Sequence, residues 1–311
     1  ARSKNVVSVR LLRSIGIGKL MDHLRLFGFD VKPEQRNEAL ALGAIEVSPM
    51  EMVTGYAAIA NGGFKVEPYF ITRVEDSQGN ILYEAKPKRA CDTCANQLAQ
   101  TAATDNPISG AQSSANSEIP LDVAADLAPQ IISHANAFLV SEALHSAIFG
   151  GRDRGMNAGW MGTGWRAAKE LGRSDIAGKT GTTNEAKDAW FSGFNSKLVA
   201  TSWVGFDDHR RKLGRSIAGN EFGASAAQPI WIDFMKVAMA GMPESPIPQP
   251  QDVVTVRIDN FSGLMSSRED GSSRSEFFQR GTEPTLANPG NSTLFGEGEP
   301  ATPGTSTEDI F

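Results

Sequence analysis

Gly178-Lys179-Thr180-Gly181-Thr182-Thr183 is the stretch that decides how the rest of this chain is interpreted. A short apolar lead, Ile176-Ala177, comes just before these small and hydroxyl-bearing residues. Two more strand-like runs follow, at 189–194 and 198–206, and the second alternates two sets of side chains with the period of a strand. The pattern predicts an antiparallel meander that begins with a Lys-Thr-Gly-Thr strand.

Two kinds of site can contain the residues Gly178-Lys179-Thr180-Gly181. Gly-Lys-Thr ends the phosphate-binding pattern G-x-x-x-x-G-K-[ST], but that pattern needs glycine at position 173, where Arg173 stands, and a helix after the loop. A Lys-Thr-Gly strand also occurs in serine acyltransferases that bind β-lactams, where it accompanies a Ser-x-Asn motif. That motif is present as Ser3-Lys4-Asn5. The two motifs together favour the acyltransferase over the phosphate loop.

Three stretches, 3–12, 162–167 and 178–194, resemble the transpeptidase domain of class A penicillin-binding proteins of Gram-negative bacteria. The resemblance extends from Ala1 to Pro284. It implies an α+β fold of the penicillin-recognising serine transpeptidase and β-lactamase type, with an antiparallel five-stranded sheet flanked by helices. The active site would lie between the Lys-Thr-Gly strand and the helical Ser-x-Asn edge.

The residue types at these motifs suit acyl transfer through a serine ester. The Ser3 hydroxyl can relay a proton toward a leaving nitrogen, and the Asn5 amide can hold the peptide group of a substrate. Lys179 places a positive charge beside that hydroxyl. We therefore expect Ser3, Asn5 and Lys179 to be catalytic, and the resemblance implies the same roles.

The rest of the predicted strand offers contacts for a substrate. Hydroxyls of Thr180 and Thr182 can bind a terminal carboxylate, and Gly181 lets a substrate backbone lie against the strand. The resemblance also implies that the Thr182 backbone N–H is an oxyanion donor and that Thr183 borders the site. We assign Asp188 no catalytic role and expect an ion pair with Lys187 or Arg166.

The nucleophile of the family is missing from this sequence. It is the serine of Ser-x-x-Lys, and no lysine here has a serine three residues before it. Since Ala1-Arg2-Ser3 begins inside a motif without methionine, we expect an N-terminally incomplete fragment that is inactive alone. The nucleophile, a glycosyltransferase domain and an inner-membrane anchor would lie upstream in the parent protein.

The predicted function is therefore that of a peptidoglycan D,D-transpeptidase, acting on stem peptides that end in D-Ala-D-Ala and inhibited by β-lactams. A D,D-carboxypeptidase shares the motifs and remains an alternative. The absent nucleophile also leaves open a non-catalytic β-lactam- or peptide-binding module. Expected partners are stem peptides, β-lactams and cell-wall synthesis proteins, at the periplasmic face of the inner membrane.

The charge and the cysteine content of the chain argue against some classes of function. The chain has 311 residues and a net charge of −6 without a block of like charges, which argues against nucleic-acid binding. Cys91 and Cys94 form a C-x-x-C pair without a second ligand pair, so we expect a local disulfide or free thiols rather than a zinc site. No metal and no cofactor are predicted.

The chain divides into four parts by composition. We expect the transpeptidase domain at 1–86 and 130–245, a flexible low-complexity insertion at 87–129, and an extension with a tail at 246–311. A capping signal, Ser48-Pro49-Met50-Glu51, predicts a helix that runs to Ala60. Other predicted helices and strands, in chain order, lie at 5–15, 19–27, 69–74, 81–84, 137–148, 165–171, 224–240, 253–258 and 275–280.

Overall fold

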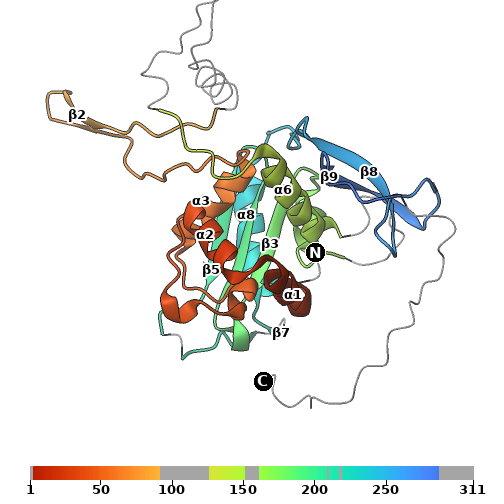
Figure 1. Cartoon of the computed structure of the whole chain (residues 1–311). Helices are drawn as coiled ribbons and strands as arrows, with labels where there is room; N and C mark the ends of the chain where they lie inside the picture. Colours follow the sequence, from red (N-terminus) through yellow and green to blue (C-terminus); the bar gives the residue numbers. More distant parts are fainter. Residues whose placement is uncertain (1–2, 92–125, 151–160, 209, 217–218, 287–311) are drawn as a thin grey trace, which may run out of the picture.

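The structure, a computed structural model, describes residues 3–91, 126–150, 161–208, 210–216 and 219–286 (Figure 1). At its centre is an antiparallel sheet in the order β3-β4-β5, formed by Ala177–Thr182, Ala189–Phe194 and Val199–Val204. The predicted meander and the α+β class are confirmed. Within the described ranges this sheet contains three strands instead of the expected five, because the other strands pair locally into separate two-stranded ribbons.

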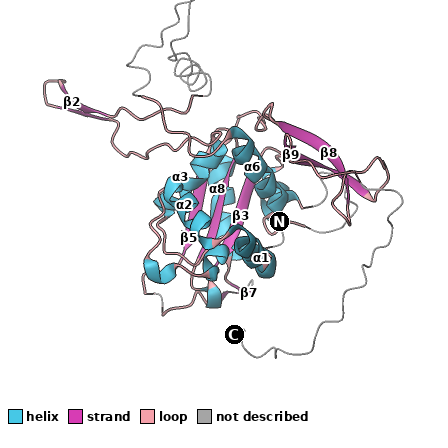
Figure 2. Cartoon of the chain, viewed as in Figure 1, coloured by secondary structure: helices cyan, strands magenta, loops and turns pink. Residues whose placement is uncertain are grey.

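Helices cover both faces of the sheet (Figure 2). On one face Trp231 of α8 (Gln228–Ala238) packs on Phe191 of β4, with ring centroids 4.9 Å apart. On the other face Tyr56 of α3 (Pro49–Ala60) meets Phe194 edge-on, at 6.3 Å. This separation follows from the strand period, since Phe191 and Phe194 differ by an odd number of residues and point to opposite faces.

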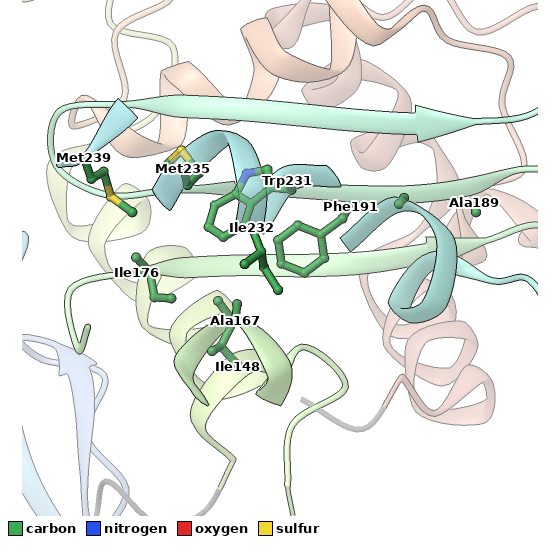
Figure 3. Packing of buried hydrophobic residues seen from close by; sticks show 10 residues of the cluster. Ile148, Ala167, Ile176, Ala189, Phe191, Trp231, Ile232, Met235 and Met239 are labelled. Carbon is green, nitrogen blue, oxygen red and sulfur yellow. The ribbon is translucent and has the colours of Figure 1, made fainter. Parts of the chain in front are cut away.

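The main hydrophobic core lies on the α8 face. Figure 3 shows side chains of α8 directed toward Phe191, with Ile148 of α6 (His134–Phe149) and Ala167 of α7 (Trp165–Leu171) below them. The fully buried polar side chain Gln228 lies at the start of α8 and ties these layers together. Its Nε2 donates a 2.8 Å hydrogen bond to Gly164 O, while its Oε1 has no partner among the described residues.

The predicted capping box of α3 is confirmed. Ser48 Oγ accepts from Glu51 N at 3.2 Å, and the Glu51 carboxylate accepts from Ser48 N at 2.7 Å. The backbone amides of Ser48 and Glu51 thereby have hydrogen-bond partners. The hydrogen bonds from Ser48 also lower the pKa of Glu51. This end of α3 is fixed by its own sequence.

The N-terminal helices are α1 (Asn5–Ile15) and α2 (Ile17–Phe27), separated by Gly16 at φ 89°. The helical spacing in α1 predicts an apolar face, and Leu12 is buried. Val7, Leu11 and Ile15, in contrast, are 66%, 58% and 46% exposed. Periodicity therefore located the helix correctly, but it did not show which apolar side chains have a neighbour in the structure.

Most of the remaining elements agree with the predicted ranges, but the strand predicted at 69–74 is wrong in extent, since β1 begins only at Arg73. The expected closing helix is split into a π-helical turn, η5 (Gly223–Ala227), followed by α8. Three ribbons are β1 (Arg73–Glu75) with β2 (Ile81–Glu84), β6 (Arg215–Ser216) with β7 (Gly219–Asn220), and β8 (Val253–Asp259) with β9 (Ser273–Gln279). Short 3-10 turns lie at η1 (Pro33–Gln35), η2 (Glu38–Leu42) and η4 (Asn184–Ala186).

Parts of the predicted organisation lie outside the described residues. These are most of the expected insertion at 87–129 and the tail beyond 286. Cys91 is disulfide-bonded, as one of the two alternatives predicts, and Cys94 lies outside the described ranges. The β8–β9 ribbon, in the expected extension, packs on α6 through Phe138 and Phe277, with ring centroids 5.1 Å apart.

Candidate active site

The period of strand β3 distributes the predicted site residues over its two faces. Lys179 is paired with Ser192, which shares a face with Phe194 and α3. Thr180 is paired with Phe191 and Thr182 with Ala189, so both threonines point to the α7 and α8 side. One strand thus presents a cation on one face and hydroxyls on the other.

The structure brings Ser3 and Lys179 together, although 176 residues separate them. Lys179 Nζ donates to Ser3 Oγ and makes a second hydrogen bond, of 2.9 Å, to Thr180 O. Burial lowers the pKa of Lys179 from its usual value of 10.5. An ammonium group that is partly removed from water and held on a hydroxyl is a suitable proton donor through that hydroxyl.

Ser3 has a strained backbone. Its φ is 46°, in the left-handed region that a non-glycine residue adopts at a cost of about 1–2 kcal/mol. The strained residue directly precedes Lys4, the N-cap of α1, and its hydroxyl is the one that Lys179 contacts. Such outliers occur where surrounding contacts hold them and are enriched at functional sites.

Asn5, the third predicted catalytic residue, is the first residue of α1 and is exposed. Its side chain makes no hydrogen bond to any described residue. The structure therefore places Asn5 two residues from the Ser3–Lys179 pair, with its amide free to meet a ligand.

Thr180 is held by a residue that the sequence analysis did not select. Its Oγ1 lies 3.0 Å from Thr163 Oγ1, just before α7. The glycines on either side of Thr163 are tightly enclosed: a Cβ on Gly162 would lie 2.1 Å from Ala147 O, and one on Gly164 would lie 3.2 Å from Ile148. Close packing of the segment against α6 therefore fixes where the Thr163 hydroxyl can be.

Thr182, on the same face of β3 as Thr180, is held by a different segment of the chain. Its Oγ1 accepts a 3.0 Å hydrogen bond from Gly223 N, at the start of η5. A Cβ on Gly223 would lie 2.4 Å from Gly181 O and 2.6 Å from Trp190 O, so only glycine fits here. Because the Thr182 hydroxyl accepts this bond, its own proton stays available for another acceptor.

Thr183 and Asp188 close the turn after β3. Asp188 N donates to Thr183 Oγ1 at 2.8 Å, and Asp188 Oδ1 accepts from Trp203 Nε1 at 3.0 Å. The expected ion pair of Asp188 was wrong, because Lys187 pairs with Glu185 and Arg166 with Glu170. Asp188 instead accepts a hydrogen bond from the Trp203 indole and holds the turn through Thr183.

The candidate site therefore combines the predicted residues with supporting residues that the sequence did not point to. Thr163, Gly223 and Gln228 were missed because none of them forms part of a chemical motif. One signal was available for Thr163, since Gly162-Thr163-Gly164 belongs to a stretch on which the family resemblance rests. The other two can be recognised only from their contacts.

Two further features of the described residues concern metal ions and membranes. No cluster of three or more His, Cys, Asp or Glu side chains is arranged there to hold a metal ion. None of the helices that the structure describes combines the length and the hydropathy needed to cross a lipid bilayer.

Comparison with known proteins gives one consistent result. The family model "Penicillin binding protein transpeptidase domain" matches residues 1–236. Penicillin-binding protein 1A of Escherichia coli K12 is 41% identical over 315 residues, covering 91% of this chain and 36% of that protein. The corresponding protein of Vibrio cholerae is 41% identical over 295 residues, covering 92% of this chain and 34% of that protein.

A solved structure agrees. Penicillin-binding protein 1A from Haemophilus influenzae matches with a TM-score of 0.74 and 40% identity, covering 92% of this chain and 40% of that chain. The chain thus spans only about a third of the length of its curated relatives, at 36% and 34%. Since the family model covers well over half of its residues, this chain belongs to the penicillin-binding protein transpeptidase domain family.

Proposed function

We propose that this chain provides the Ser-x-Asn and Lys-Thr-Gly side of the active site of a serine D,D-transpeptidase that crosslinks peptidoglycan stem peptides. The observation that carries the proposal is the hydrogen bond between Lys179 and Ser3. It joins two motifs that lie 176 residues apart in the sequence, and it places an ammonium donor on a hydroxyl, as a proton relay requires. Membership of the transpeptidase family supports the same reading.

Lys179 and Ser3 form the proton route to the leaving amine. Because Lys179 Nζ–H donates to Ser3 Oγ, the hydroxyl proton of Ser3 points elsewhere and can pass to the leaving nitrogen. Ser3 then recovers a proton from the Lys179 ammonium, whose pKa is lowered by burial. Asn5, at the start of α1, holds the peptide group of the donor stem.

Strand β3 binds the end of the substrate. Thr180 and Thr182 donate hydroxyl protons to the terminal carboxylate, and Gly181 allows the substrate backbone to lie along the strand. The Thr182 N–H serves as one oxyanion donor. Thr183 borders this region, and its hydroxyl is already used by Asp188 N.

The acylated serine has to come from outside these 311 residues, because none of their lysines follows a serine at Ser-x-x-Lys spacing. Within these residues we assign the transpeptidase domain to 1–86 and 130–245, the insertion to 87–129 and the extension to 246–311. The longer protein would carry the nucleophile, a glycosyltransferase domain and an inner-membrane anchor. Its site would face the periplasm, bind stem peptides and β-lactams, and meet other cell-wall synthesis proteins.

The first test is covalent labelling. A fluorescent penicillin is added to the full-length protein and to the isolated chain, and adducts are identified by intact mass. Labelling of the full-length protein alone supports the proposal, and Lys179→Ala in that protein should reduce the acylation rate at least about 100-fold, typical for loss of a catalytic group. Labelling of the isolated chain, or unchanged acylation of the Lys179→Ala variant, contradicts it.

Product analysis separates the related functions. With donor and acceptor stem peptides, a transpeptidase forms the joined stem in an acceptor-dependent reaction. A carboxypeptidase would release D-Ala without joining stems. Reversible penicillin binding without an adduct in the full-length protein would instead identify a non-catalytic binding module.

A further inference from the structure

The hydroxyl pair between Thr163 and Thr180 lies on the face of β3 that is turned toward α7 and α8. Their Oγ1 atoms are 3.0 Å apart, and both residues are half-buried. Thr180 belongs to the Lys-Thr-Gly strand, whereas Thr163 comes from the segment between α6 and α7. The contact thus links the proposed carboxylate-binding strand to a separate, tightly packed part of the domain.

Thr163 has little freedom to move. Gly162 and Gly164 on either side of it are buried, and Gly164 N donates a 2.9 Å hydrogen bond to Ala147 O. Gly164 O accepts from the buried Gln228 side chain at 2.8 Å. These contacts fix the backbone that carries Thr163 without using its hydroxyl.

The number of protons decides what this pair can do. A hydroxyl has one proton to donate and two lone pairs that accept. If Thr180 donates to Thr163, Thr180 presents only lone pairs to a ligand, which an anion cannot use. If Thr163 donates to Thr180, the Thr180 proton is free for a carboxylate, and the chain of two hydrogen bonds strengthens the second one.

Thr180 Oγ1 donates to Thr163 Oγ1 in the structure. We propose that Thr163 is a positioning residue for carboxylate recognition: when a carboxylate binds, this hydrogen bond reverses, so that Thr163 donates its hydroxyl proton to Thr180 and the Thr180 proton is directed toward the terminal carboxylate of the ligand. This inference rests on the proposed function, because it assigns Thr180 to that carboxylate. Thr163 itself touches neither the ligand nor the reacting atoms. Its effect is specific for ligands that carry the negative charge.

The test compares a charged with an uncharged ligand in the full-length protein. Acylation rate constants are measured for benzylpenicillin and for its methyl ester, which lacks the carboxylate charge. Thr163→Val should slow acylation by benzylpenicillin about fivefold, the value of one hydrogen bond, and leave the ester rate unchanged. The loss should appear in the half-saturating concentration rather than in the maximal rate, with an unaltered pH profile, because Lys179 is unaffected.

Four other variants at this pair complete the test. The quantity compared is the ratio of the acylation rate constant for benzylpenicillin to that for its methyl ester. Thr163→Ser keeps the hydroxyl and should restore this acid-to-ester ratio to within about twofold of the wild-type value. Thr180→Val should lower the ratio as well, and adding Thr163→Val to it should cause no further loss, since both act through one hydrogen-bond chain. Thr163→Ala gives the same comparison if valine is not accommodated.

The matched control is Thr201→Val. Thr201 Oγ1 donates to Ser192 Oγ at 2.9 Å, a similar hydroxyl pair between β4 and β5, and its loss should leave the ratio unchanged. An equal slowing of acid and ester by Thr163→Val, or no change in either, overturns the role of Thr163. Lys179→Ala run in parallel identifies which idea fails: retained acylation there contradicts the proposed function, whereas lost acylation with an unaltered Thr163→Val ratio contradicts this inference alone.

Discussion

Trp203 Nε1 donates a 3.0 Å hydrogen bond to Asp188 Oδ1 and so connects β5 to the turn that follows the Lys-Thr-Gly strand. The same carboxylate lies 3.3 Å from Thr183 Oγ1, and the Asp188 amide donates to that hydroxyl. Two residues of the turn, Glu185 and Ala186, have positive φ values of 62° and 52°. Asp188 therefore stabilises a strained turn at the end of the proposed substrate-binding strand.

Replacing this carboxylate should destabilise the domain. Asp188→Ala leaves the Trp203 N–H without its partner, which should lower the free energy of unfolding by about 1–3 kcal/mol. Urea denaturation measures the loss. The control is Glu46→Ala, which removes an exposed pair with Lys32 and should change stability by no more than about 0.5 kcal/mol. Equal effects of the two substitutions would show that the Trp203 contact contributes nothing.

Gly223→Ala should damage both stability and acylation. The new Cβ would lie 2.4 Å from Gly181 O, so either η5 or β3 must shift, and the hydrogen bond from Gly223 N to Thr182 would be disturbed. Gly18→Ala is a matched control in α2, where a Cβ meets nothing within 4 Å. It should raise the free energy of unfolding by about 0.5–1 kcal/mol. Normal acylation by the Gly223→Ala variant would contradict the proposed role of this contact.

Lys179 predicts a pH dependence of stability. Its pKa is lowered by burial, so between that value and 10.5 the unfolded chain binds more protons than the folded one. Stability therefore rises with pH across this window as the ammonium loses its charge. Lys179→Met lacks this gain, so the unfolding temperature of the wild type relative to this variant should increase from neutral pH toward pH 10.5. A constant or decreasing difference would mean that burial does not dominate at Lys179.

Ser3 variants separate a relay from a structural role. Ser3→Ala removes the hydroxyl that Lys179 contacts, whereas Ser3→Gly removes it and also relieves the positive φ of 46°. Acyl transfer by the full-length protein should slow by about 10²-fold or more in both variants, the size of a lost proton-transfer group. Thermal unfolding should show that the glycine variant is no less stable than the alanine variant. Equal fractional losses of activity and stability would identify Ser3 as a structural cap.

Local signals in the sequence were sufficient for most elements. The capping box at Ser48 and Glu51 predicted the start of α3 because its hydrogen bonds join residues close in sequence. The meander was predictable for a similar reason, since hairpin strands pair with their sequence neighbours. The burial of α1 could not be predicted in this way: spacing shows that Val7 and Leu11 share a face, but a neighbour for that face depends on tertiary packing.

The candidate site was recognisable from the sequence only where it carries a motif. Ser3 and Lys179 were recognised from residue types whose chemistry is characteristic, and the structure brings them into contact. Thr163 and Gly223 act through position alone, and a threonine between glycines or a glycine before a helix is common in proteins. Asp188 was misassigned because the nearest cations in sequence are not its neighbours in space.

Under the proposed function, the buried contact between Gln228 and Gly164 O has a consequence for the evolution of drug resistance. Gln228 is fully buried in the core, yet the backbone that it holds carries Thr163 and, through it, Thr180. If Thr180 binds the carboxylate of a β-lactam as proposed, a substitution at Gln228 would alter how strongly an antibiotic is bound without removing any atom that the antibiotic touches. Surveillance limited to residues that line the drug would overlook changes of this kind.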